Sequence, residues 1–455
     1  MKKQQKDAVK QDGKLSRRDF IASAAAATAA VTIVPRHVLG GPGQTAPSDK
    51  LNVAILGCGA QGQVLLNACL KIPDMLSFRA VCDIWTDYNQ KRVYRLLKKY
   101  GHQTNAYEDY QEMFANEQDL DAVLIATPDF WHADHAIGAL GAGINVYLEK
   151  EMSNTLEGAK RIVNAVKKSG KLLQVGHQRR SNPYYLHAYS KVIENNMLGQ
   201  ITTVNGQWNR GVQPDLGWPK KYAIPPATLR KYGFKNMLQY RNWRWYKGLG
   251  GGPIVDLGSH QIDIYSWFLR TMPSTVMASG GTDYYEKETH EWYDSALVTY
   301  EFEAEMGTVR AFYQTITTNS NQGYYEVFMG DQGALVISES AGKAGIYREP
   351  SAPQWDRFVE LGYLSAPVAD AGPANTGAVL DVRETVPPPK YTFPVNFNDP
   401  YHQPHLLNFF NSVRGQDTLN CPVEVGYETA VAVLRVNEAI ETGMKLKFEP
   451  GEFHA

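Results

Sequence analysis

A glycine-rich segment has the spacing that indicates a binding chemistry most directly. Residues 57–62 read G-C-G-A-Q-G, after an apolar run at 51–56 and before a stretch with helical periodicity. Between a strand and a helix, Gly57 permits a tight turn, Gly59 lets the backbone approach a pyrophosphate, and Gly62 lets the helix pack closely on its sheet. The start of that helix offers free N–H groups to phosphates.

Asp83 follows Gly62 by 21 residues, at the end of the next apolar run. A carboxylate at this place accepts hydrogen bonds from a ribose hydroxyl, and its charge repels a 2′-phosphate. The alternative to a dinucleotide site is an ordinary glycine turn followed by a solvated aspartate. The combined context favours a dinucleotide site that prefers NAD, with NADP as the alternative.

Three further side chains have the chemistry to move or stabilise a proton. Lys150 follows the apolar run 145–148, at the carboxyl end of a predicted parallel strand, where open α/β sheets bind their ligands. Asp256 and His260 are four residues apart, so on a helix they share one face. The aspartate could then orient the imidazole or bind a hydroxyl. Taken singly, such a lysine is usually solvated and such a histidine is usually structural.

The elements that would position these residues follow two patterns. Apolar runs at 51–56, 78–82, 122–126, 145–148 and 172–175 alternate with helical patterns, of which 132–142 and 156–168 are the clearest. This alternation predicts a parallel α/β sheet of the Rossmann type, the dinucleotide-binding domain, over residues 50–176.

Residues 177–455 show the period of two that is typical of half-buried strands. The predicted strands lie at 201–208, 296–303, 308–315, 324–329 and 334–338. Short turns at 305–307 and 330–333 imply antiparallel pairing. The second domain is therefore expected to be an α+β domain with an open, mainly antiparallel sheet.

Several motifs in the same order resemble the Gfo/Idh/MocA oxidoreductase family, which is named after glucose–fructose oxidoreductase and inositol dehydrogenase. They are A-T-P-D-F-W-H at 126–132, V-Y-L-E-K at 146–150, G-G-G-P-I-V-D-L-G-S-H at 250–260, and F-F-N-S-V-R-G with P-V-E near the C-terminus. The resemblance runs from about residue 51 to 447. It implies a two-domain dehydrogenase that transfers a hydride between a sugar or polyol carbon and a nicotinamide.

The resemblance also implies roles for individual residues. His260 would be the acid/base, Lys150 would polarise the reacting oxygen, and Asp256 would support both. The cofactor would contact Gly57, Gly59, Ala60, Gln61, Gly62, Asp83, Thr127, Pro128, His132, Glu149 and Lys150. The substrate would contact Lys150, His177, Arg179, Trp243, Asp256 and His260. The sequence departs from the pattern once: family members commonly have proline after the lysine, where this chain has Glu151.

Two stretches of the second domain are unusually rich in aromatic residues or proline. Residues 208–246 interleave Trp and Tyr with Lys and Arg, which suits either a carbohydrate site or a subunit interface. Residues 349–404 are expected to form a long irregular excursion that is functional or oligomeric. His402 and His405 lie at its end, but without suitable Cys or carboxylate spacing we expect no metal site.

The N-terminus resembles an export signal. Five lysines precede the paired Arg17 and Arg18, and an Ala-rich run then leads to Pro35. Residues 1–40 are therefore expected to be a twin-arginine signal peptide, which would send an already folded, cofactor-loaded protein to the periplasm. The alternative is a basic tail followed by an ordinary helix. The apolar run is too short and Ala-rich for a membrane span, so no stable membrane insertion is expected.

Composition excludes several classes of protein. The 455 residues are 43% hydrophobic and 20% charged with a net charge of −1, which is globular rather than disordered and gives no basic excess for nucleic acid. Four scattered cysteines exclude a disulfide scaffold. Residues 1–40 carry eight Lys and Arg against three Asp, so the rest of the chain carries about −6.

The leading hypothesis is an exported NAD(P)-dependent oxidoreductase acting on a sugar or glycoside hydroxyl carbon, expected to be C3, with a tightly bound cofactor and a homodimeric or homotetrameric assembly. The alternative is a redox-type glycoside hydrolase, in which transient oxidation acidifies a neighbouring C–H and permits elimination and then hydration. A third hypothesis is a non-catalytic sugar-binding or assembly protein with the same fold. Retention of Lys150, Asp256 and His260 argues against that third hypothesis.

Overall fold

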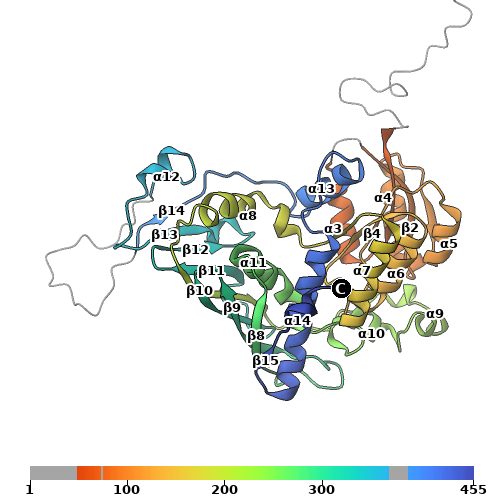
Figure 1. Cartoon of the computed structure of the whole chain (residues 1–455). Coiled ribbons are helices and arrows are strands. Elements are labelled where there is room, and N and C mark those ends of the chain that lie inside the picture. The colour runs from red at the N-terminus through yellow and green to blue at the C-terminus, as the bar shows by residue number, and fades with distance from the viewer. Residues whose placement is uncertain (1–48, 73–74, 368–387) are drawn as a thin grey trace, which may run out of the picture. The chain divides into compact units, whose positions relative to one another are not determined.

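The computed structural model describes residues 49–72, 75–367 and 388–455. The predicted signal peptide at 1–40 lies outside the described residues. Residues 51–455 form one compact unit that contains two sheets (Figure 1). None of the described helices is long and apolar enough to cross a membrane.

The first sheet is parallel throughout, with the strand order β3-β2-β1-β4-β5-β6. Its strands are β1 (Leu51–Leu56), β2 (Leu76–Cys82), β3 (Asn105–Tyr107), β4 (Ala122–Ile125), β5 (Asn145–Leu148) and β6 (Leu173–Val175). This confirms the predicted Rossmann arrangement. The edge strand β3 was not predicted, because its three residues are largely exposed and carry no apolar run.

Helices connect these strands and flank the sheet (Figure 1). They are α3 (Ala60–Cys69), α4 (Lys91–Lys99), α5 (Tyr110–Asn116), α6 (Asp129–Gly141) and α7 (Leu156–Ser169). Helix α6 begins three residues earlier than predicted, directly after Pro128, whose extended backbone ends the preceding loop. Helix α7 matches its prediction within one residue, because Thr155 caps its first turn and Gly170 ends it in the left-handed conformation.

The second sheet has the order β14-β13-β12-β11-β7-β10-β9-β8-β15. The five predicted strands are present within two residues at each end, and the mainly antiparallel pairing is confirmed, although β7 and β10 pair in parallel. Four strands were not predicted: β8, β13, β14 and β15. The bounds are β7 (Ile201–Asn209), β8 (Pro273–Gly281), β9 (Ser295–Ala304), β10 (Gly307–Ile316), β11 (Tyr324–Gly330), β12 (Gly333–Ile337), β13 (Gly345–Arg348), β14 (Lys390–Tyr391) and β15 (Leu446–Lys447).

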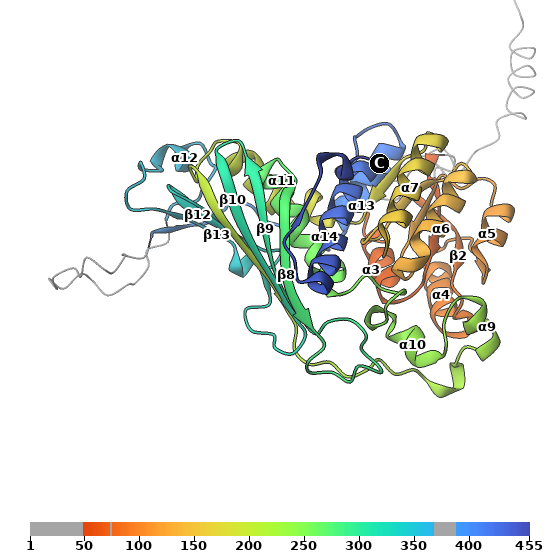
Figure 2. The same ribbon diagram turned by 60° about the horizontal axis from the view of Figure 1, so that its bottom comes forward.

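Two helices pack against the second sheet, and one of them also contacts the first domain. Helix α11 (Ser259–Leu269) packs against β7, and α14 (Val423–Thr442) packs against β8, α11 and α7, so it lies between the second sheet and the first domain (Figure 2). Helix α13 (Gln403–Val413) returns to the first domain, where Leu406, Phe409 and Phe410 enter the core around β1 and α3. Short helices complete the unit: α8 (Pro183–His187), α9 (Pro226–Lys231), α10 (Met237–Arg241) and α12 (Asp356–Glu360).

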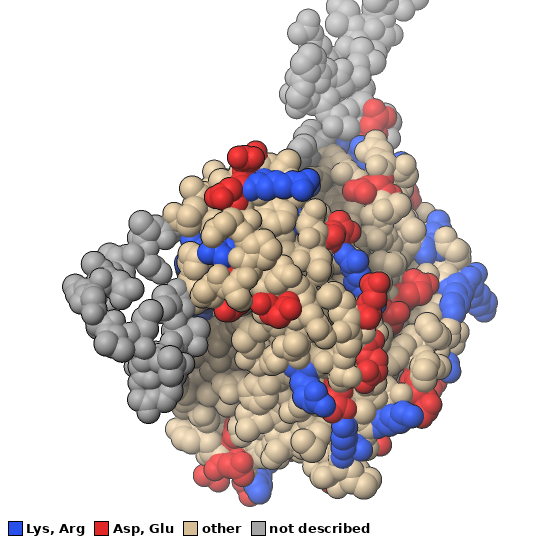
Figure 3. All heavy atoms as spheres, turned by 60° about the vertical axis from the view of Figure 1, so that its left-hand side comes forward, with Lys and Arg blue, Asp and Glu red and all other residues tan. Residues whose placement is uncertain are grey.

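The proline-rich region 349–404 is irregular over most of its described part, with the short elements α12 and β14 within it. Its centre, residues 368–387, lies outside the described residues. On the face shown in Figure 3, basic and acidic side chains are interspersed among uncharged residues.

Candidate active site

A cavity of about 580 Å³ lies where the carboxyl ends of the first sheet's strands meet the second domain. Its walls come from the loops after β1, β2, β4 and β5, from α11 and the turn before it, from β7, and from the end of the proline-rich region. This is the place where open α/β sheets bind ligands, because the strand ends leave a crevice there.

The glycine loop forms one wall of the cavity. Gly57 has a φ of +95°, and a Cβ on it would lie 2.6 Å from the carbonyl oxygen of Ala126. A Cβ on Gly62 would lie 1.9 Å from the carbonyl oxygen of Gly57, so α3 packs at a distance that only glycine permits. At Gly59, by contrast, the nearest atom would be 4.0 Å away. The loop is therefore closed toward the sheet and open toward the cavity.

Asp83 stands beside this loop and is held by backbone donors. Its Oδ2 accepts a hydrogen bond from the Cys58 N–H and its Oδ1 from the Trp85 N–H, each at 2.7 Å. Burial raises the pKa of Asp83 to about 6, although the two N–H donors oppose that rise. The carboxylate is thus mainly ionised at neutral pH.

Lys150, Asp256 and Arg244 form a charged cluster on the opposite side. The Lys150 ammonium donates to the backbone oxygen of Asp256, and its Nζ lies 3.5 Å from Asp256 Oδ1. Arg244 Nε donates to the same Oδ1 at 3.2 Å. Burial disfavours the charged carboxylate, but Lys150 and Arg244 outweigh that effect and hold the pKa of Asp256 well below its usual value. Asp256 is therefore an ionised anchor for two cations.

His260 lines the cavity next to an aromatic wall. Its ring centroid lies 5.3 Å from that of Trp208, which stacks on Tyr324 at 4.6 Å. Burial, together with the charge of Lys150, lowers the pKa of His260 well below the usual histidine value. Its Nδ1 is buried and has no hydrogen-bond partner among the described residues, so Nε2 is the nitrogen that can face the cavity. A neutral imidazole in this position is suited to accept a proton.

Sequence models of one oxidoreductase family match most of the chain. One, described as an oxidoreductase family with an NAD-binding Rossmann fold, matches residues 51–177, and its companion, a C-terminal alpha/beta domain, matches residues 190–448. The chain belongs to the Gfo/Idh/MocA oxidoreductase family.

Individual relatives are more distant. The inositol 2-dehydrogenase of Salmonella typhimurium (strain LT2) is 30% identical over 199 residues, which cover 43% of this chain and 57% of that protein. The scyllo-inositol 2-dehydrogenase (NADP(+)) of Bacillus subtilis is 26% identical over 249 residues, or 55% of this chain and 60% of that protein. The chain therefore aligns with less than two thirds of the length of either relative.

A solved structure gives the same fold at greater coverage. The aldose–aldose oxidoreductase of Caulobacter crescentus, complexed with glycerol, superposes with a TM-score of 0.63 over 88% of this chain and 100% of that one. The two sequences are 18% identical. The Rossmann domain followed by a mainly antiparallel α/β domain is thus the fold of the Gfo/Idh/MocA family.

The residues of the cavity fit the dinucleotide that this family's fold binds. The open face at Gly59, the uncapped N-terminus of α3 and the adjacent carboxylate of Asp83 match the needs of a pyrophosphate and a ribose. Gln61 adds a link to the far wall, since its Nε2 donates to Glu149 Oε1 at 3.0 Å and lies 3.1 Å from His402 Nε2.

Most of the site residues predicted from sequence line this cavity. They are Gly57, Gly59, Ala60, Gln61, Asp83, Thr127, Pro128, Glu149, Lys150, Trp243, Asp256 and His260. Gly62 lies beneath the loop, in agreement with its predicted packing role. The structure does not, however, pair Asp256 with His260: the helical turn over Ile254–Gly258 directs the Asp256 carboxylate to Lys150 and Arg244 instead.

Three predicted contact residues lie behind the cavity wall rather than in it. Arg179 is buried in ion pairs with Glu326 and with Glu339, the latter at 3.1 Å, which occupy two of its three guanidinium nitrogens. The His132 ring lies between two backbone oxygens, those of Glu151 at 2.7 Å and Thr127 at 2.8 Å. His177 is also fully buried and lines no part of the cavity. The structure thus places these three side chains behind the lining of the cavity, and their direct contact with cofactor or substrate stays a prediction.

Several cavity residues were not singled out from the sequence. Asp129 lies inside the motif at 126–132, which follows β4, but it was given no role of its own. Trp208 and Arg244 belong to the aromatic and basic stretch 208–246 that the sequence did highlight. Tyr324, Glu339, Tyr401 and His402 come from distant segments and could not be assigned to the cavity before the chain was folded.

Asp129 has the most unusual electrostatic environment of these. It is 5% exposed at the start of α6. Burial, reinforced by the charge of Asp256, raises the pKa of Asp129 to about 8, although Arg244 and Lys150 partly offset the rise. Two carboxyls near Lys150 and Arg244 thus differ in charge at neutral pH: Asp256 is ionised, and Asp129 keeps its proton.

The aromatic stretch 208–246 divides between two roles. Trp208, Trp243 and Trp245 line the cavity, as a carbohydrate site would require. Others pack within the chain against the first domain, where the Trp131 indole donates to the Tyr232 carbonyl at 3.1 Å. Packing between the domains was not one of the two alternatives considered from sequence. Among the described residues, no group of three or more His, Cys, Asp or Glu side chains is arranged to hold a metal ion.

Proposed function

We propose that this chain is an exported NAD(P)-dependent oxidoreductase that transfers a hydride between a hydroxyl carbon of a sugar or glycoside and a tightly held nicotinamide cofactor. The observation that carries the proposal is the convergence of Lys150, Asp256 and His260 on the same cavity as the glycine loop. Alcohol oxidation needs a base for the hydroxyl proton and a cation near the developing alkoxide, and this arrangement offers both.

Each residue has a role that follows from its surroundings. His260, kept neutral by burial, takes the hydroxyl proton. Lys150, held by Asp256, stabilises the negative charge on the oxygen. Asp256 remains ionised and fixes the position of the ammonium. A nicotinamide cofactor, when bound beside the glycine loop, would supply the hydride acceptor.

The substrate class is supported by the lining of the site and by the names of the relatives. Indole faces of Trp208 and Trp243 suit the C–H faces of a sugar ring, and charged side chains beside them suit its hydroxyls. The named activities of the relatives, inositol 2-dehydrogenase and aldose–aldose oxidoreductase, both involve polyhydroxylated substrates. We propose C3 as the carbon oxidised, on the family resemblance.

Export by the twin-arginine route is part of the proposal and rests on the sequence of residues 1–40. Free NAD is scarce outside the cytoplasm, so an exported enzyme would carry its cofactor and regenerate it within each cycle.

Homo-oligomerisation is proposed on the exposed face of the second sheet, where the apolar side chains of Met277, Leu297 and Phe312 are accessible to solvent.

A redox-type glycoside hydrolase is the second candidate, and one observation favours it. Such an enzyme needs a further acid or base beside the oxidation machinery, and Asp129 lines the same cavity with a raised pKa of about 8. This carboxyl could exchange a proton with a neighbouring carbon or a leaving group after the oxidation step.

The deciding experiment uses the purified mature protein. Any bound nucleotide is released by heat and identified, and the native protein is then incubated with sugars and aryl glycosides while nicotinamide absorbance and product mass are followed. A keto-sugar supports the oxidoreductase, and free aglycone without net cofactor change supports the hydrolase. Absence of bound or bindable nucleotide would contradict both.

Two variants sharpen this experiment. His260→Ala should abolish turnover while nucleotide affinity is largely retained, because the imidazole acts on the substrate proton.

Asp83→Ser should lower the preference for NAD over NADP by about tenfold or more, since it removes a negative charge beside the ribose. Equal preference in the parent protein would contradict the assignment of NAD.

A further inference from the structure

Glu151, which follows Lys150, has a buried carboxylate of which only one oxygen is hydrogen-bonded within the described part of the chain. Its side chain is 0% exposed. Its Oε1 accepts a hydrogen bond from the Met152 N–H at 2.9 Å, but Oε2 has no partner among the described residues. Because burying a carboxylate without partners is costly, a position like this calls for an explanation.

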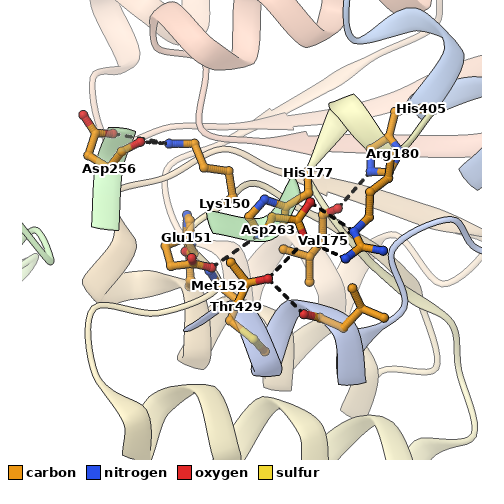
Figure 4. A network of polar contacts seen from close by, with 12 residues as sticks. Lys150, Glu151, Met152, Val175, His177, Arg180, Asp256, Asp263, His405 and Thr429 are labelled. Atoms are coloured by element: carbon orange, nitrogen blue, oxygen red, sulfur yellow. Dashed lines mark hydrogen bonds and ion pairs between the residues drawn. The ribbon is translucent and has the colours of Figure 1, made fainter. Parts of the chain in front are cut away.

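His177 lies next to this carboxylate and is equally unsatisfied. The residue is 1% exposed, and neither ring nitrogen has a hydrogen-bond partner among the described residues. His177 Nε2 lies 3.8 Å from Glu151 Oε1, a distance at which a protonated imidazole and a carboxylate form an ion pair. In Figure 4, Lys150 reaches toward Asp256, whereas Glu151 lies on the side of His177.

His260 lies between this pair of residues and the cavity. The rings of His177 and His260 lie 6.4 Å apart between centroids and are nearly perpendicular, at 86°. His260 Nδ1, the nitrogen turned away from the cavity, has no partner among the described residues. Three neighbouring buried groups therefore hold unsatisfied polar atoms in sequence from the cavity inward: His260, His177 and Glu151.

Several other buried atoms close to these residues in the chain also lack a hydrogen-bond partner among the described residues, namely Arg179 Nη2, Ser259 Oγ and both polar atoms of the Gln261 amide. His260, His177 and Glu151 differ from them in lying next to one another.

Asp263 and His405, which also face His177, are hydrogen-bonded to other groups. Arg180 Nε donates to both oxygens of Asp263, at 2.9 and 3.0 Å, and Thr429 donates to Oδ1 of the same carboxylate at 3.2 Å (Figure 4). The His405 imidazole lies between Ser181 Oγ at 2.6 Å and the Val175 carbonyl at 2.9 Å.

We propose that His177 and Glu151 form a buried proton relay behind His260, an inference that rests on the proposed function. The O–H bond of the substrate breaks and its proton binds His260 Nε2, while the hydride leaves the same carbon. The Nδ1 proton of His260 then passes to His177 through one bridging water. The Glu151 carboxylate stabilises the resulting His177 cation as an ion pair. Reduction of a ketone runs through the same steps in reverse.

The relay gives the departure from the family pattern a function. A proline after the lysine has no side chain that could stabilise a cation, whereas Glu151 brings a negative charge to the inner end of the path. In this arrangement Glu151 acts through His177 and does not touch the substrate, so it is a positioning residue. A proton held inside the protein also suits a cycle that oxidises and then reduces without exchanging its cofactor.

The test compares Glu151→Gln and His177→Gln with Glu117→Gln in the full-length protein. Glu117 is also buried, but it accepts hydrogen bonds from Asn105 and Tyr107 and does not line the cavity. Both relay variants should lower kcat by about tenfold or more, with KM and nucleotide affinity nearly unchanged. Glu151→Asp should restore part of the loss, and Glu117→Gln should leave kcat unchanged.

The pH profile separates a relay from a packing role. Removing the Glu151 charge should move the acidic limb of kcat/KM to lower pH, since a nearby carboxylate favours protonated imidazole. The other charged or titratable groups that face the two histidines are Lys150, Arg179, His402, Asp263 and His405, and all are unchanged in the variant. An unshifted limb with a lower melting temperature would overturn the proposal.

A measurement without substrate keeps this test separate from that of the proposed function. In ¹⁵N-histidine-labelled protein, Glu151→Gln should change the ring signals of both His177 and His260, with His260→Ala providing the assignment. Glu117→Gln should change neither. If no sugar is turned over, coupled ring signals still support the relay. If His260 does not respond to Glu151→Gln, the relay is wrong even when the enzyme is active.

Discussion

At the scale of single residues, burial keeps the His260 imidazole neutral, as the proton transfer that we propose for it requires. Its pKa lies well below 6.5 because burial and the charge of Lys150 disfavour the imidazolium. A base acts in its unprotonated form, so kcat/KM for alcohol oxidation should stay constant as pH falls through 6.5 and decline only further down. The pH profile with a turned-over sugar checks this. A half-maximal rate at the usual histidine pKa would contradict it.

Burial of Asp129 lowers the stability of the fold at high pH, because it disfavours the ionised carboxylate. Its pKa of about 8 in the folded protein exceeds its ordinary value of 3.8, so between these values the folded state holds a proton that the unfolded chain has released. Stability contributed by this group therefore falls as pH rises through that window. Asp129→Asn should raise the free energy of unfolding by on the order of a few kcal/mol near pH 8 and much less near pH 5. Denaturation at both pH values measures the difference; an equal effect at both would refute it.

At the scale of elements, two glycines at the start of α3 have different roles: Gly62 lets the helix pack closely, and Gly59 leaves the loop open toward the cavity. Gly62→Ala places a methyl group 1.9 Å from a backbone oxygen, so it should destabilise the fold by about 1–3 kcal/mol and weaken nucleotide binding. Gly59→Ala meets no atom closer than 4.0 Å, so it should leave the melting temperature unchanged while nucleotide affinity falls. Thermal denaturation and nucleotide titration of both variants test this. Equal destabilisation by the two would contradict the assigned roles.

At the scale of the whole unit 51–455, the two sheets share one core. A single buried cluster includes Val123 and Val146 from the first sheet and Tyr300 and Phe328 from the second. Helix α14 connects them so tightly that a Cβ on Gly426 would lie 2.4 Å from Val175 Cγ2. We therefore expect one cooperative thermal transition, raised as a whole by NAD. Calorimetry with and without nucleotide checks this, and two separate transitions, only one of them sensitive to NAD, would contradict it.

Local patterns predicted the parts of the molecule that depend on neighbouring residues. The strands at 51–56 and 145–148 coincide with β1 and β5, since each ends in a run of consecutive apolar residues, 53–56 and 146–148, that is buried within a parallel sheet. The same reasoning missed β3, β14 and β15, which have only two or three residues and little apolar character. The glycine loop was predictable because its three glycines have a fixed spacing between an apolar run and a helical pattern.

By itself the sequence determined the fold class, the glycine loop and the choice of Lys150, Asp256 and His260 as candidate site residues, since motif spacing and hydrophobic period are local properties. Only the tertiary structure decided which groups surround each polar side chain. It buried Arg179 against two glutamates, brought His402 to the cavity from the end of the proline-rich region, and placed His177 between Glu151 and His260. These contacts join residues that are up to hundreds of positions apart in the sequence, and no local pattern predicts which of them will form an ion pair or a hydrogen bond.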